Sequence, residues 1–515
     1  VNLLIEGDNY HSLAVLNFTH QNKIDVIYID PPYNTGNKDF IYNDQFVDIE
    51  DTYRHSKWLS FMSKRLQLAK NLLKDEGVIF ISIDDNEQSN LKLICDKIFG
   101  EENFVSLLSV ENNPKGRKNS SYISVSSEYC LIYAKNKYIG YFNEVIPKDE
   151  KDMIKDEKGN YVHNSGKRVL VGENNFNKRV TNYNSDKHYS VYYNKELENI
   201  IFKKENRLAE ADNEIIAKGY KRYVSYLKDY FVENTYTSNK LKKLFDEDEL
   251  DIKENKIYEK NYSSLTRLKS ILTNRKYKAI VNNQSIEYEI DLKSTSAQQM
   301  LKKILGKEIF SFPKNVSFIK LLTQLCPNKN ATVLDYFAGS GTTGHAVLKL
   351  NKEDGGNRRF ILCTNNENNI VEDVCYPRIK KVIEGYPGAK GIPANLKYFK
   401  TSFVSKSKVS DDTRRDLVKR STEMICVREN TFDSILDKKS YKIFKDSNHT
   451  TGILFDLDEI ESFKKSLIDQ KMPAHIYVFS LTKDVFDEDF EDLNLTYELC
   501  PIPESILEVY KKLFK

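Results

Sequence analysis

The strongest chemical signal in the sequence is the heptapeptide DPPYNTG, from Asp30 to Gly36, which follows a short apolar run. Two successive prolines fix φ and remove two N–H donors, so the turn is stiff and its carbonyls remain available as acceptors. The carboxylate of Asp30 and the carbonyl of Pro31 could together accept both hydrogens of an exocyclic amine. Such an amine is a poor nucleophile because its lone pair is delocalised into the ring, and these acceptors would favour its pyramidal, reactive form.

Tyr33 follows the second proline, Pro32, and offers an aromatic face on which an extruded base can stack. An ordinary proline-rich turn with a surface tyrosine is the competing interpretation. The complete tetrad, followed by NTG and preceded by a strand, disfavours it. We therefore predict that Asp30, Pro31, Pro32 and Tyr33 form a catalytic loop that acts on the amine of a base.

The second signal is DYFAGSGTTG, from Asp335 to Gly344, where a strand, a glycine loop and a helix are expected in succession. Gly339, Gly341 and Gly344 also fit the G-x-G-x-x-G dinucleotide pattern, which by itself is a weak indication. Glycines let a ligand approach the backbone closely, and a helix start offers free N–H groups to an anion. For S-adenosylmethionine that anion would be the amino acid carboxylate, and Asp335 could bind the cationic amine.

Three weaker candidates fit the same cofactor pocket. Glu367 lies just past the expected strand RFILC, where an acidic residue can accept both hydroxyls of a ribose, although a surface carboxylate is the alternative. Asp8, in the tripeptide GDN after the expected strand LLIE, could bond the adenine of the cofactor or could cap the next helix. Lys314, in FPK, could reach a carboxylate or could be solvated.

The hydrophobic pattern predicts the elements that must position these residues. Short apolar runs predict strands at 25–30, 78–83, 332–335 and 359–363. Segments with a helical period predict helices at 52–74, 91–99, 315–325 and 342–350. This alternation indicates a doubly wound α/β sheet, in which ligands bind at the carboxyl ends of the strands. The proline turn and the glycine turn are therefore expected to meet at one edge of that sheet.

The segment from about 136 to 300 has a different composition, rich in lysine, asparagine and tyrosine, with weak periodicity. Basic residues outnumber acidic ones there, and tyrosines are interleaved with them: Tyr183, Tyr189, Tyr192, Tyr193, Tyr220, Tyr223, Tyr226 and Tyr230. This pattern suits a nucleic-acid surface, but it also suits an α+β insertion with half-buried tyrosines and solvated lysines. Beyond about residue 403 the chain is charged and mixed, with strands expected at 451–457 and 476–481.

Length and composition limit the class of protein. A chain of 515 residues is expected to form about two to four units. Its 78 basic and 75 acidic residues give a formal net charge of +3, which neither requires nor excludes nucleic acid. The seven cysteines are scattered without a C-x-x-C pair, so we expect reduced thiols, with no disulfide framework and no metal site. There is no apolar run of bilayer length and VNLLIEGDNY does not resemble a signal peptide, so we expect a soluble, cytoplasmic protein.

With these residues in place, the sequence resembles the β-class DNA amino-methyltransferases, and most closely the modification subunits of type III restriction-modification systems. The resemblance rests on motif order: DPPYNTG, a long insertion, then FPK and DYFAGSGTT. The stretches LQLAKNLLKDEGVIFISIDD (66–85) and SEYCLIYAK (127–135) also match. Specific motifs cover about 1–135 and 305–400, and the remainder matches only by position. Tyr336 replaces a phenylalanine that is commoner in the family and keeps the aromatic ring.

The resemblance implies a seven-strand, mostly parallel sheet with one antiparallel strand, in circularly permuted order. The catalytic half (1–135) precedes the cofactor half (305–402), with an α+β target-recognition domain between them (136–304). A small α+β region (403–515) would then serve dimerisation or partner docking. The implied catalytic residues are Asp30, Pro31, Pro32 and Tyr33. The implied contacts to S-adenosyl-L-methionine are Asp335, Phe337, Ala338, Gly339, Ser340, Gly341, Thr342, Glu367, Asp8 and Lys314, and no metal is implied.

The implied reaction is direct methyl transfer to the N6 amine of an adenine flipped out of double-stranded DNA. A homodimer and a restriction subunit with nuclease and helicase activity are the implied partners, and no membrane is involved. There is no Walker loop, so ATP-driven translocation would come from another chain. Cytosine N4 methylation stays open because the same loop serves that amine. A DNA-recognition subunit that acts mainly with a nuclease or helicase chain also stays open. A structured RNA substrate is less favoured because the large insertion suits the reading of a duplex. A nicotinamide dehydrogenase is less favoured because it leaves DPPY unexplained.

Overall fold

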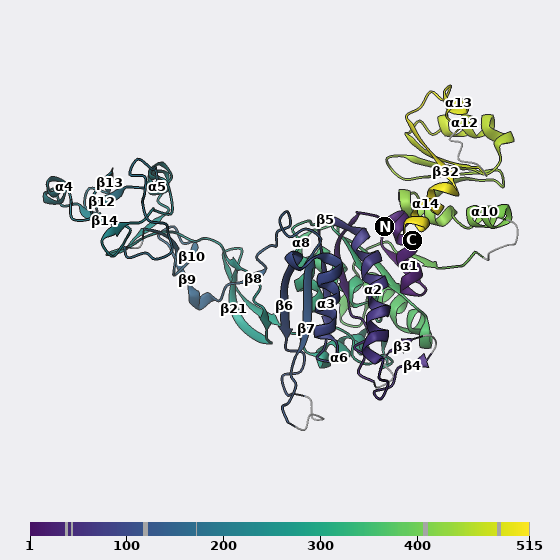
Figure 1. The fold of residues 1–515 in the computed structure, drawn as a ribbon, viewed down its shortest axis with the longest axis horizontal. Helices are drawn as coiled ribbons and strands as arrows, with labels where there is room; N and C mark the ends of the chain where they lie inside the picture. The colour runs from purple at the N-terminus through teal and green to yellow at the C-terminus, as the bar shows by residue number, and fades with distance from the viewer. Residues whose placement is uncertain are drawn as a thin grey trace. The chain divides into compact units, whose positions relative to one another are not determined.

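The computed structural model describes the whole chain except residues 37–39, 43–44, 117–121, 171, 405–409, 481–485 and 514–515. The chain forms two compact units (Figure 1). The first comprises residues 1–143, 269–275 and 290–515, and the second comprises residues 144–268 and 276–289. Among the described residues, no helix combines the length and the apolar composition needed to cross a bilayer.

A nine-stranded sheet forms the centre of the first unit. Its strands are, in spatial order, β20 (Ile271–Leu272), β6 (Phe104–Val110), β7 (Glu128–Ala134), β5 (Leu73–Ile83), β2 (Ile24–Ile29), β23 (Thr332–Asp335), β24 (Arg359–Thr364), β1 (Leu3–Glu6) and β27 (Lys397–Lys400). β7 runs antiparallel to both neighbours, and every other pair is parallel. The predicted α/β sheet with one antiparallel strand is confirmed. The expected number of seven strands is wrong, because the short strands β20 and β27 pair with the outer edges of β6 and β1.

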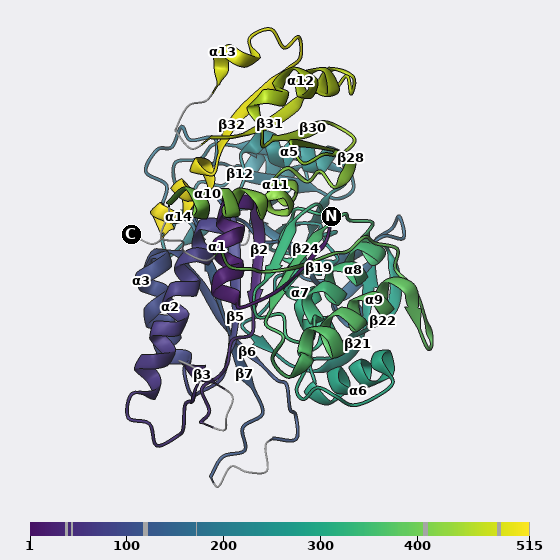
Figure 2. The ribbon, with the colours of Figure 1, turned by 90° about the vertical axis from the view of Figure 1, so that its right-hand side faces the viewer.

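Helices cover both faces of this sheet. Figure 2 shows α1 (Asn9–Thr19), α2 (Arg54–Leu72) and α3 (Gln88–Phe99) on one side, and α7 (Val316–Gln324), α8 (Thr342–Asp354) and α9 (Tyr376–Glu384) on the other. The first group packs on the sheet through a core that includes the fully buried Trp58, Leu66 and Leu91. A mostly parallel sheet with helices on both of its faces is the doubly wound arrangement that the sequence predicts. Two short hairpins, β3–β4 (Ile41–Tyr42, Gln45–Phe46) and β25–β26 (Gly385–Tyr386, Ala389–Lys390), complete this part.

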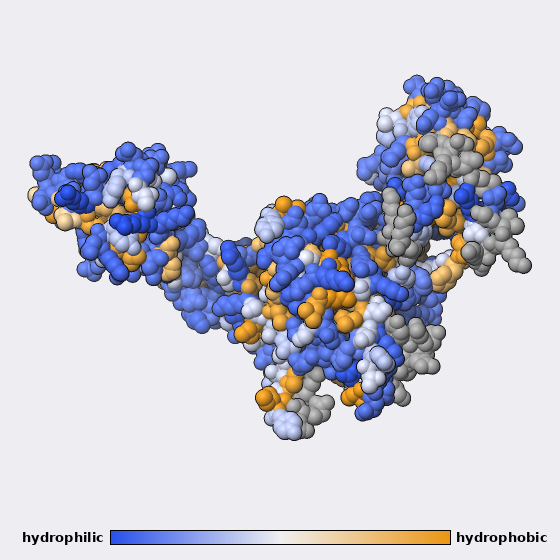
Figure 3. Space-filling view, in the orientation of Figure 1, coloured by the Kyte–Doolittle hydropathy of each residue, from blue (hydrophilic) through white to orange (hydrophobic). Residues whose placement is uncertain are grey.

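The second unit consists of small antiparallel sheets and two helices. Its elements are β8 (Ile146–Pro147), β9 (Met153–Lys155), β10 (Tyr161–His163), β11 (Lys167–Leu170), β12 (Ser190–Asn194), β13 (Asn199–Lys203), α4 (Asn213–Ala217), β14 (Lys221–Tyr223), β15 (Tyr226–Leu227), β16 (Tyr230–Phe231), α5 (Ser238–Asp246), β17 (Leu250–Ile252), β18 (Ile257–Glu259), β19 (Leu265–Thr266), β21 (Arg275–Val281) and β22 (Gln284–Ile290). Tyr189, Tyr192, Tyr220 and Tyr223 are buried, so the alternative that tyrosines form its core is confirmed for these four. Its visible surface is mostly hydrophilic (Figure 3).

The second unit contains fewer residues than the expected insertion of 136–304. The helix α6 (Ser294–Leu305) belongs to the first unit, because its apolar side chains, including Ala297, Leu301 and Ile304, are buried and it packs against α9. The segment 269–275 also returns to the first unit, where β20 pairs with β6. The packing of α6 and the pairing of β20 shorten the insertion at its carboxyl end, and residues 136–143 at its amino end also belong to the first unit.

The region after residue 403 forms a five-stranded sheet with helices. The strands are β28 (Asp433–Asp437), β29 (Tyr441–Lys445), β30 (Thr450–Leu454), β31 (Ala474–Phe479) and β32 (Tyr497–Ile502), and the helices are α10 (Ser410–Lys419), α11 (Thr422–Glu429), α12 (Ile460–Ile468), α13 (Asp487–Phe490) and α14 (Glu504–Leu513). The strands expected at 451–457 and 476–481 are confirmed as β30 and β31, although residue 481 lies outside the described residues. Helices α11 and α14 pack against α1.

Candidate active site

Four neighbouring parallel strands, β2, β23, β24 and β1, end at one edge of the sheet, and each is followed or ended by a predicted site residue. Because β2 and β23 pair in parallel register, Asp30 and Asp335 lie at the ends of adjacent strands. Glu367 follows β24 and Asp8 follows β1. The prediction that the proline turn and the glycine turn meet at one sheet edge is therefore confirmed.

The proline loop is held in place by side chains from α2 and from the turn before α3. The indole Nε1 of the buried Trp58 donates a hydrogen bond to the carbonyl of Pro32 at 2.7 Å. Asn34 has a φ of 58° and its side-chain amide donates to the carboxylate of Glu87 at 2.5 Å. Within the described residues, no hydrogen bond reaches the carbonyl of Pro31. That carbonyl is therefore available to a ligand, whereas the carbonyl of Pro32 fixes the loop.

A charged cluster lies beside this loop. The Nζ of Lys314 is 2.7 and 2.8 Å from the two carboxylate oxygens of Glu128 and 3.3 Å from Oδ1 of Asp30. It also donates to the hydroxyl of Tyr33 at 2.5 Å, and that hydroxyl donates to Glu128 at 3.2 Å. Only 14% of the Lys314 side chain and 6% of the Glu128 side chain are exposed. Two carboxylates thus share one buried ammonium group.

Burial sets the electrostatics of this cluster. Burial raises the pKa of Asp30, while the Lys314 ammonium lowers it and the Glu128 carboxylate raises it further. Burial would lower the pKa of Lys314, but the two carboxylates outweigh it and the pKa is raised. The Oδ1 atom of Asp30 is buried and lies 3.3 Å from the Lys314 ammonium, and it has no closer hydrogen-bond partner among the described residues. An acceptor in this state is suited to the hydrogen of an incoming amine.

The cluster opens into a cavity of about 900 Å³. Its lining includes Asp30, Pro31, Tyr33, Glu128 and Lys314, together with residues 292–295 and 312–313 from the segments around α6 and before α7. Ligand pockets in proteins commonly measure about 300–1,000 Å³, so this cavity can admit a nucleobase. Phe312, at its rim, has a φ of 57° and is 81% exposed.

The glycine loop needs glycine at two positions. Gly339 and Gly341 have φ values of 48° and 76°, in the left-handed region. A Cβ atom on Gly341 would lie 3.0 Å from Sγ of Cys375. α8 begins directly after Gly341, so its first N–H groups have no acceptor within the helix and can bind an anion. In the same loop, the backbone N–H of Ala338 donates to the carbonyl of Cys363, and the ring of Phe337 contacts Phe61.

Asp335 both shapes the glycine loop and provides a buried carboxylate. Its Oδ1 accepts the backbone N–H of Phe337 at 3.0 Å, and its Oδ2 accepts the hydroxyl of Thr343 at 2.5 Å. Burial raises the pKa of Asp335 to about 7, while these two hydrogen bonds lower it and the Asp30 carboxylate raises it. A cation bound at this carboxylate would stabilise its ionised form.

Sequence reasoning missed Arg378, which lies buried in α9 behind the glycine loop. Its Nη1 donates to the hydroxyls of Ser340 and Thr342 at 2.9 and 2.7 Å. These two residues are predicted cofactor contacts, and their side-chain oxygens already accept hydrogen bonds from Arg378, which holds the loop in place. Burial lowers the pKa of Arg378 to about 10. A basic residue among the apolar positions of an amphipathic helix, between Cys375 and Val382, is the signal that could have revealed it.

Sequence reasoning also missed Glu128, although it lies within SEYCLIYAK. β7 is the antiparallel strand, so its first residue lies at the edge where the parallel strands end. A carboxylate at the start of an apolar strand is the available signal. Lys314, predicted as a cofactor contact, lies with Glu128 and Tyr33 at the proline loop.

The two remaining candidates, Asp8 and Glu367, follow β1 and β24, which lie on the side of β23 away from the proline loop. Asp8 caps α1, because its carboxylate accepts the N–H of Tyr10 at 2.9 Å, and it pairs with Arg65 at 3.2 Å. The Arg65 guanidinium is also 5.8 Å from the ring centre of Tyr10. The capping alternative for Asp8 is confirmed, and its contact with adenine stays a prediction. Glu367 is exposed, with the amide of Asn365 at 3.4 Å.

A family model described as DNA methylase matches residues 24–374. The chain belongs to this DNA methylase family. The match spans both motif-bearing parts of the first unit and the intervening second unit.

Named relatives agree with this assignment. The Mod subunit of the type III restriction-modification enzyme EcoPI, from Escherichia phage P1, is 34% identical over 397 residues, which cover 71% of this chain and 58% of the relative. The type II methyltransferase M.KpnI from Klebsiella pneumoniae is 31% identical over 398 residues, which cover 75% of this chain and 88% of the relative. The methylase thus spans little more than half of the Mod subunit. The resemblance to type III modification subunits is confirmed.

Among solved structures, a DNA modification methylase from Thermus thermophilus complexed with S-adenosyl-L-methionine aligns with 78% of this methylase and all of its own chain. The sequence identity is 10% and the TM-score is 0.34. A similarity at this level supports no argument about the site.

Proposed function

We propose that this methylase transfers a methyl group from S-adenosyl-L-methionine to the N6 amine of an adenine in double-stranded DNA, as the modification and specificity subunit of a restriction-modification system. The observation that carries the proposal is the position of two loops. The proline loop after β2 and the glycine loop after β23 leave adjacent strands at one sheet edge, and the proline loop lines a cavity that is large enough to admit a nucleobase. The circularly permuted order, with the catalytic loop first, is part of this proposal.

The residues after β23, β24 and β1 fit the cofactor. The glycine loop keeps the start of α8 clear of side chains at Gly339 and Gly341, where a carboxylate can bind the N–H groups. Asp335 would bind the ammonium group, Glu367 the ribose hydroxyls, and Asp8 the adenine. The cofactor, when bound, supplies an electrophilic methyl group. The buried, only partly ionised Asp335 supports this fit, because a cationic ligand would compensate its burial.

The proline loop would activate the amine of the base. Asp30 would accept one amine hydrogen at its buried Oδ1, and the carbonyl of Pro31 would accept the other. Both acceptors would also stabilise the positive charge that develops on nitrogen during methyl transfer. Lys314 would hold Asp30 ionised and position the hydroxyl of Tyr33, whose ring would stack on the extruded base.

Replacing Tyr33 with alanine should weaken capture of the flipped base by about 1–3 kcal/mol, the value of one base–aromatic stack. Tyr33→Phe keeps the ring and loses only the hydroxyl contacts with Lys314 and Glu128, so it should retain most of the capture. Fluorescence of 2-aminopurine at the target position would measure flipping. Equal flipping by the alanine variant and the wild type would contradict stacking on Tyr33.

Binding of S-adenosyl-L-methionine should strengthen with pH because of Asp335. The pKa of Asp335 is about 7, so the carboxylate is mostly neutral at pH 6 and mostly ionised at pH 8. Only the ionised form attracts the ammonium group, so the affinity should rise roughly tenfold over this interval and then level off. Calorimetric titration at several pH values would measure it, and Asp335→Asn should bind weakly with no such rise. A flat profile in the wild type would argue against the proposed role.

The reaction itself is tested by incubating the purified chain with isotopically labelled S-adenosyl-L-methionine and unmethylated duplex DNA. Mass spectrometry of the nucleosides should show labelled N6-methyladenine. Labelled N4-methylcytosine would instead identify the alternative substrate, because the same acceptors serve that amine. Absence of any labelled base with folded protein that binds the cofactor would favour a recognition subunit without catalytic activity.

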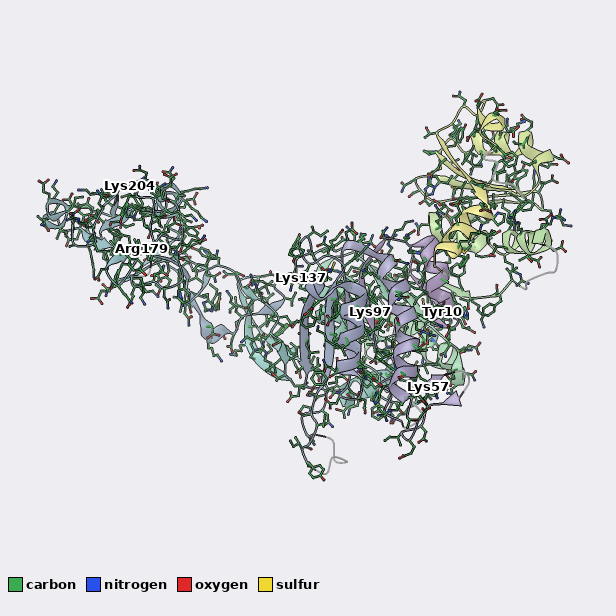
Figure 4. The ribbon with its side chains drawn as sticks, in the orientation of Figure 1. Tyr10, Lys57, Lys97, Lys137, Arg179 and Lys204 are labelled. Atoms are coloured by element: carbon green, nitrogen blue, oxygen red, sulfur yellow. The ribbon has the colours of Figure 1, made fainter. Side chains whose placement is uncertain are left out.

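We propose that the second unit reads the DNA sequence. Arg179 and Lys204 are among its basic side chains (Figure 4), and the guanidinium of Arg179 lies 4.5 Å from the ring centre of Tyr230. Such side chains can bind phosphates, while amides and guanidinium groups read base edges in the major groove. A homodimer and a nuclease and helicase chain are the proposed partners, and co-purification from cells tests both.

A further inference from the structure

Three potential metal ligands converge in the region after residue 403. Glu429 is the last residue of α11, His449 directly precedes β30, and His475 is the second residue of β31. One ligand atom from each residue lies within 4.8 Å of the other two. β30 and β31 pair in parallel, which places the two histidine rings 4.7 Å apart, centre to centre. The fold thus gathers residues that are distant in sequence.

The Glu429 carboxylate is oriented toward both histidines. Its Oε1 accepts the hydroxyl of Tyr477, so Oε2 is the atom that contacts Nδ1 of His475 and lies 4.0 Å from Nε2 of His449. Arg428 lies 3.4 Å from Oε1 and compensates part of its charge. The Oε2 atom and the two imidazoles therefore form one face of the cluster.

The second ring nitrogen of His449 is also fixed. Its Nδ1 lies 3.3 Å from the carboxylate of Asp446, which also accepts the backbone N–H of His449 at 2.9 Å. A carboxylate at Nδ1 favours the tautomer with the proton on Nδ1 and the lone pair on Nε2. In metal-bound histidines, the ring nitrogen that does not bind the metal typically donates its hydrogen to an acceptor such as this carboxylate.

The Nε2 atom of His449 is buried and has no hydrogen-bond partner among the described residues. In that tautomer its lone pair is directed toward the Glu429 carboxylate across 4.0 Å. Two electron-rich atoms that face each other in a buried site cost free energy unless a cation lies between them. This unpaired nitrogen is the observation that distinguishes the cluster from an ordinary histidine–glutamate hydrogen bond.

We propose that Glu429, His449 and His475 bind a divalent transition metal ion, with Zn²⁺ as the best-matched probe. Two imidazoles and one carboxylate are a zinc donor set that leaves a coordination position for water. The His475 side chain is 38% exposed, so the ion can reach the site from solvent. The ion would join α11, which packs on α1 of the methylase sheet, to two strands of the C-terminal sheet. The spacing of the cysteines carries no information on this site, because its ligands are histidine and glutamate.

Zinc titration of the chelator-treated, full-length chain tests the proposal. Elemental analysis and calorimetry should show about one Zn²⁺ per chain, and zinc should raise the melting temperature. His449→Ala and His475→Ala should lose this ion and this shift. Asp446→Asn should weaken binding by about 10–100-fold, as expected for a residue that orients a ligand. His163→Ala, which removes a histidine of the second unit, should bind zinc as the wild type does.

A Co²⁺-loaded wild-type chain gives a readout that does not depend on whether the variants fold. Nitrogen and oxygen ligands should give weak visible bands without thiolate charge-transfer absorption. Strong thiolate absorption would place the ion on cysteine and overturn the proposal. Failure of the folded wild type to bind zinc at micromolar concentration would overturn it as well, and so would full zinc retention by both folded histidine variants.

Discussion

Replacing Asp30 with alanine is expected to abolish methyl transfer while leaving the affinity for S-adenosyl-L-methionine nearly unchanged. The substitution removes the buried acceptor that faces the amine, and the loss of one such group typically slows a reaction by about 100-fold or more. The proposed cofactor residues follow other strands and keep their contacts. Single-turnover methylation and calorimetric cofactor binding would measure the two quantities.

The same substitution should not unfold the protein. Burial raises the pKa of Asp30, and the Glu128 carboxylate lies in the same cluster, so the ionised Asp30 is itself a cost to stability. Loss of activity with an unchanged or higher melting temperature is therefore expected. Asp75→Ala, which removes an exposed carboxylate from β5, is the matched control and should keep full activity. Turnover of the Asp30 variant near the wild-type rate would refute the assigned role.

Replacing Lys314 with methionine is expected to give the largest loss of stability among the substitutions considered. It leaves Glu128, which is almost fully buried, and Asp30 without their shared cation. Removal of one partner from a buried ion pair typically costs about 3–5 kcal/mol, because the remaining charge stays unpaired in a poorly solvated site. The shift of the urea unfolding midpoint would measure this effect.

Two further variants identify the cause of that loss. Glu128→Gln combined with Lys314→Met should recover part of the stability, because the double variant removes the unpaired charge. Lys320→Met breaks the more exposed pair with Glu353 and should cost at most about 1 kcal/mol. Equal losses for Lys314→Met and Lys320→Met would show that burial is not the cause. A large drop in cofactor affinity for Lys314→Met would instead support the predicted cofactor contact.

The catalytic loop and the glycine loop were predictable because their chemistry is local. Prolines and glycines restrict or permit particular backbone angles, so DPPY and the loop around Gly341 indicate their own geometry, and the apolar runs before them indicate the strands. The alternation of strands and helices then predicts that both loops reach one edge. These parts of the site follow from short segments of sequence.

The missed residues depend on contacts between distant segments. Glu128 reaches the site only because β7 runs antiparallel to its neighbours, and Arg378 reaches the glycine loop from α9, which comes after the next strand, β24. Of the two extra strands, β20 has only two residues, and β27 (KYFK) has a lysine at each end and so lacks the continuous apolar run that marks β1. His449 and His475 lie close together because β30 pairs with β31, and their spacing in the sequence matches no metal-binding motif. In each case, tertiary packing determines which distant segment the residue or strand contacts.

The pairing of β8 with β19 has a consequence for how such a protein can change over generations. Most of the second unit, residues 148–264, lies between two antiparallel segments that pair side by side, Ile146–Pro147 and Leu265–Thr266, and the hairpin of β21 and β22 joins the unit later in the chain. A foreign segment of different length could be spliced between them, because the entropy of closing a loop grows only with the logarithm of its length. The pairing of β2 with β23 would stay intact. If the second unit reads DNA, a new target preference could therefore arise by one recombination event, without a single change in the chemical machinery.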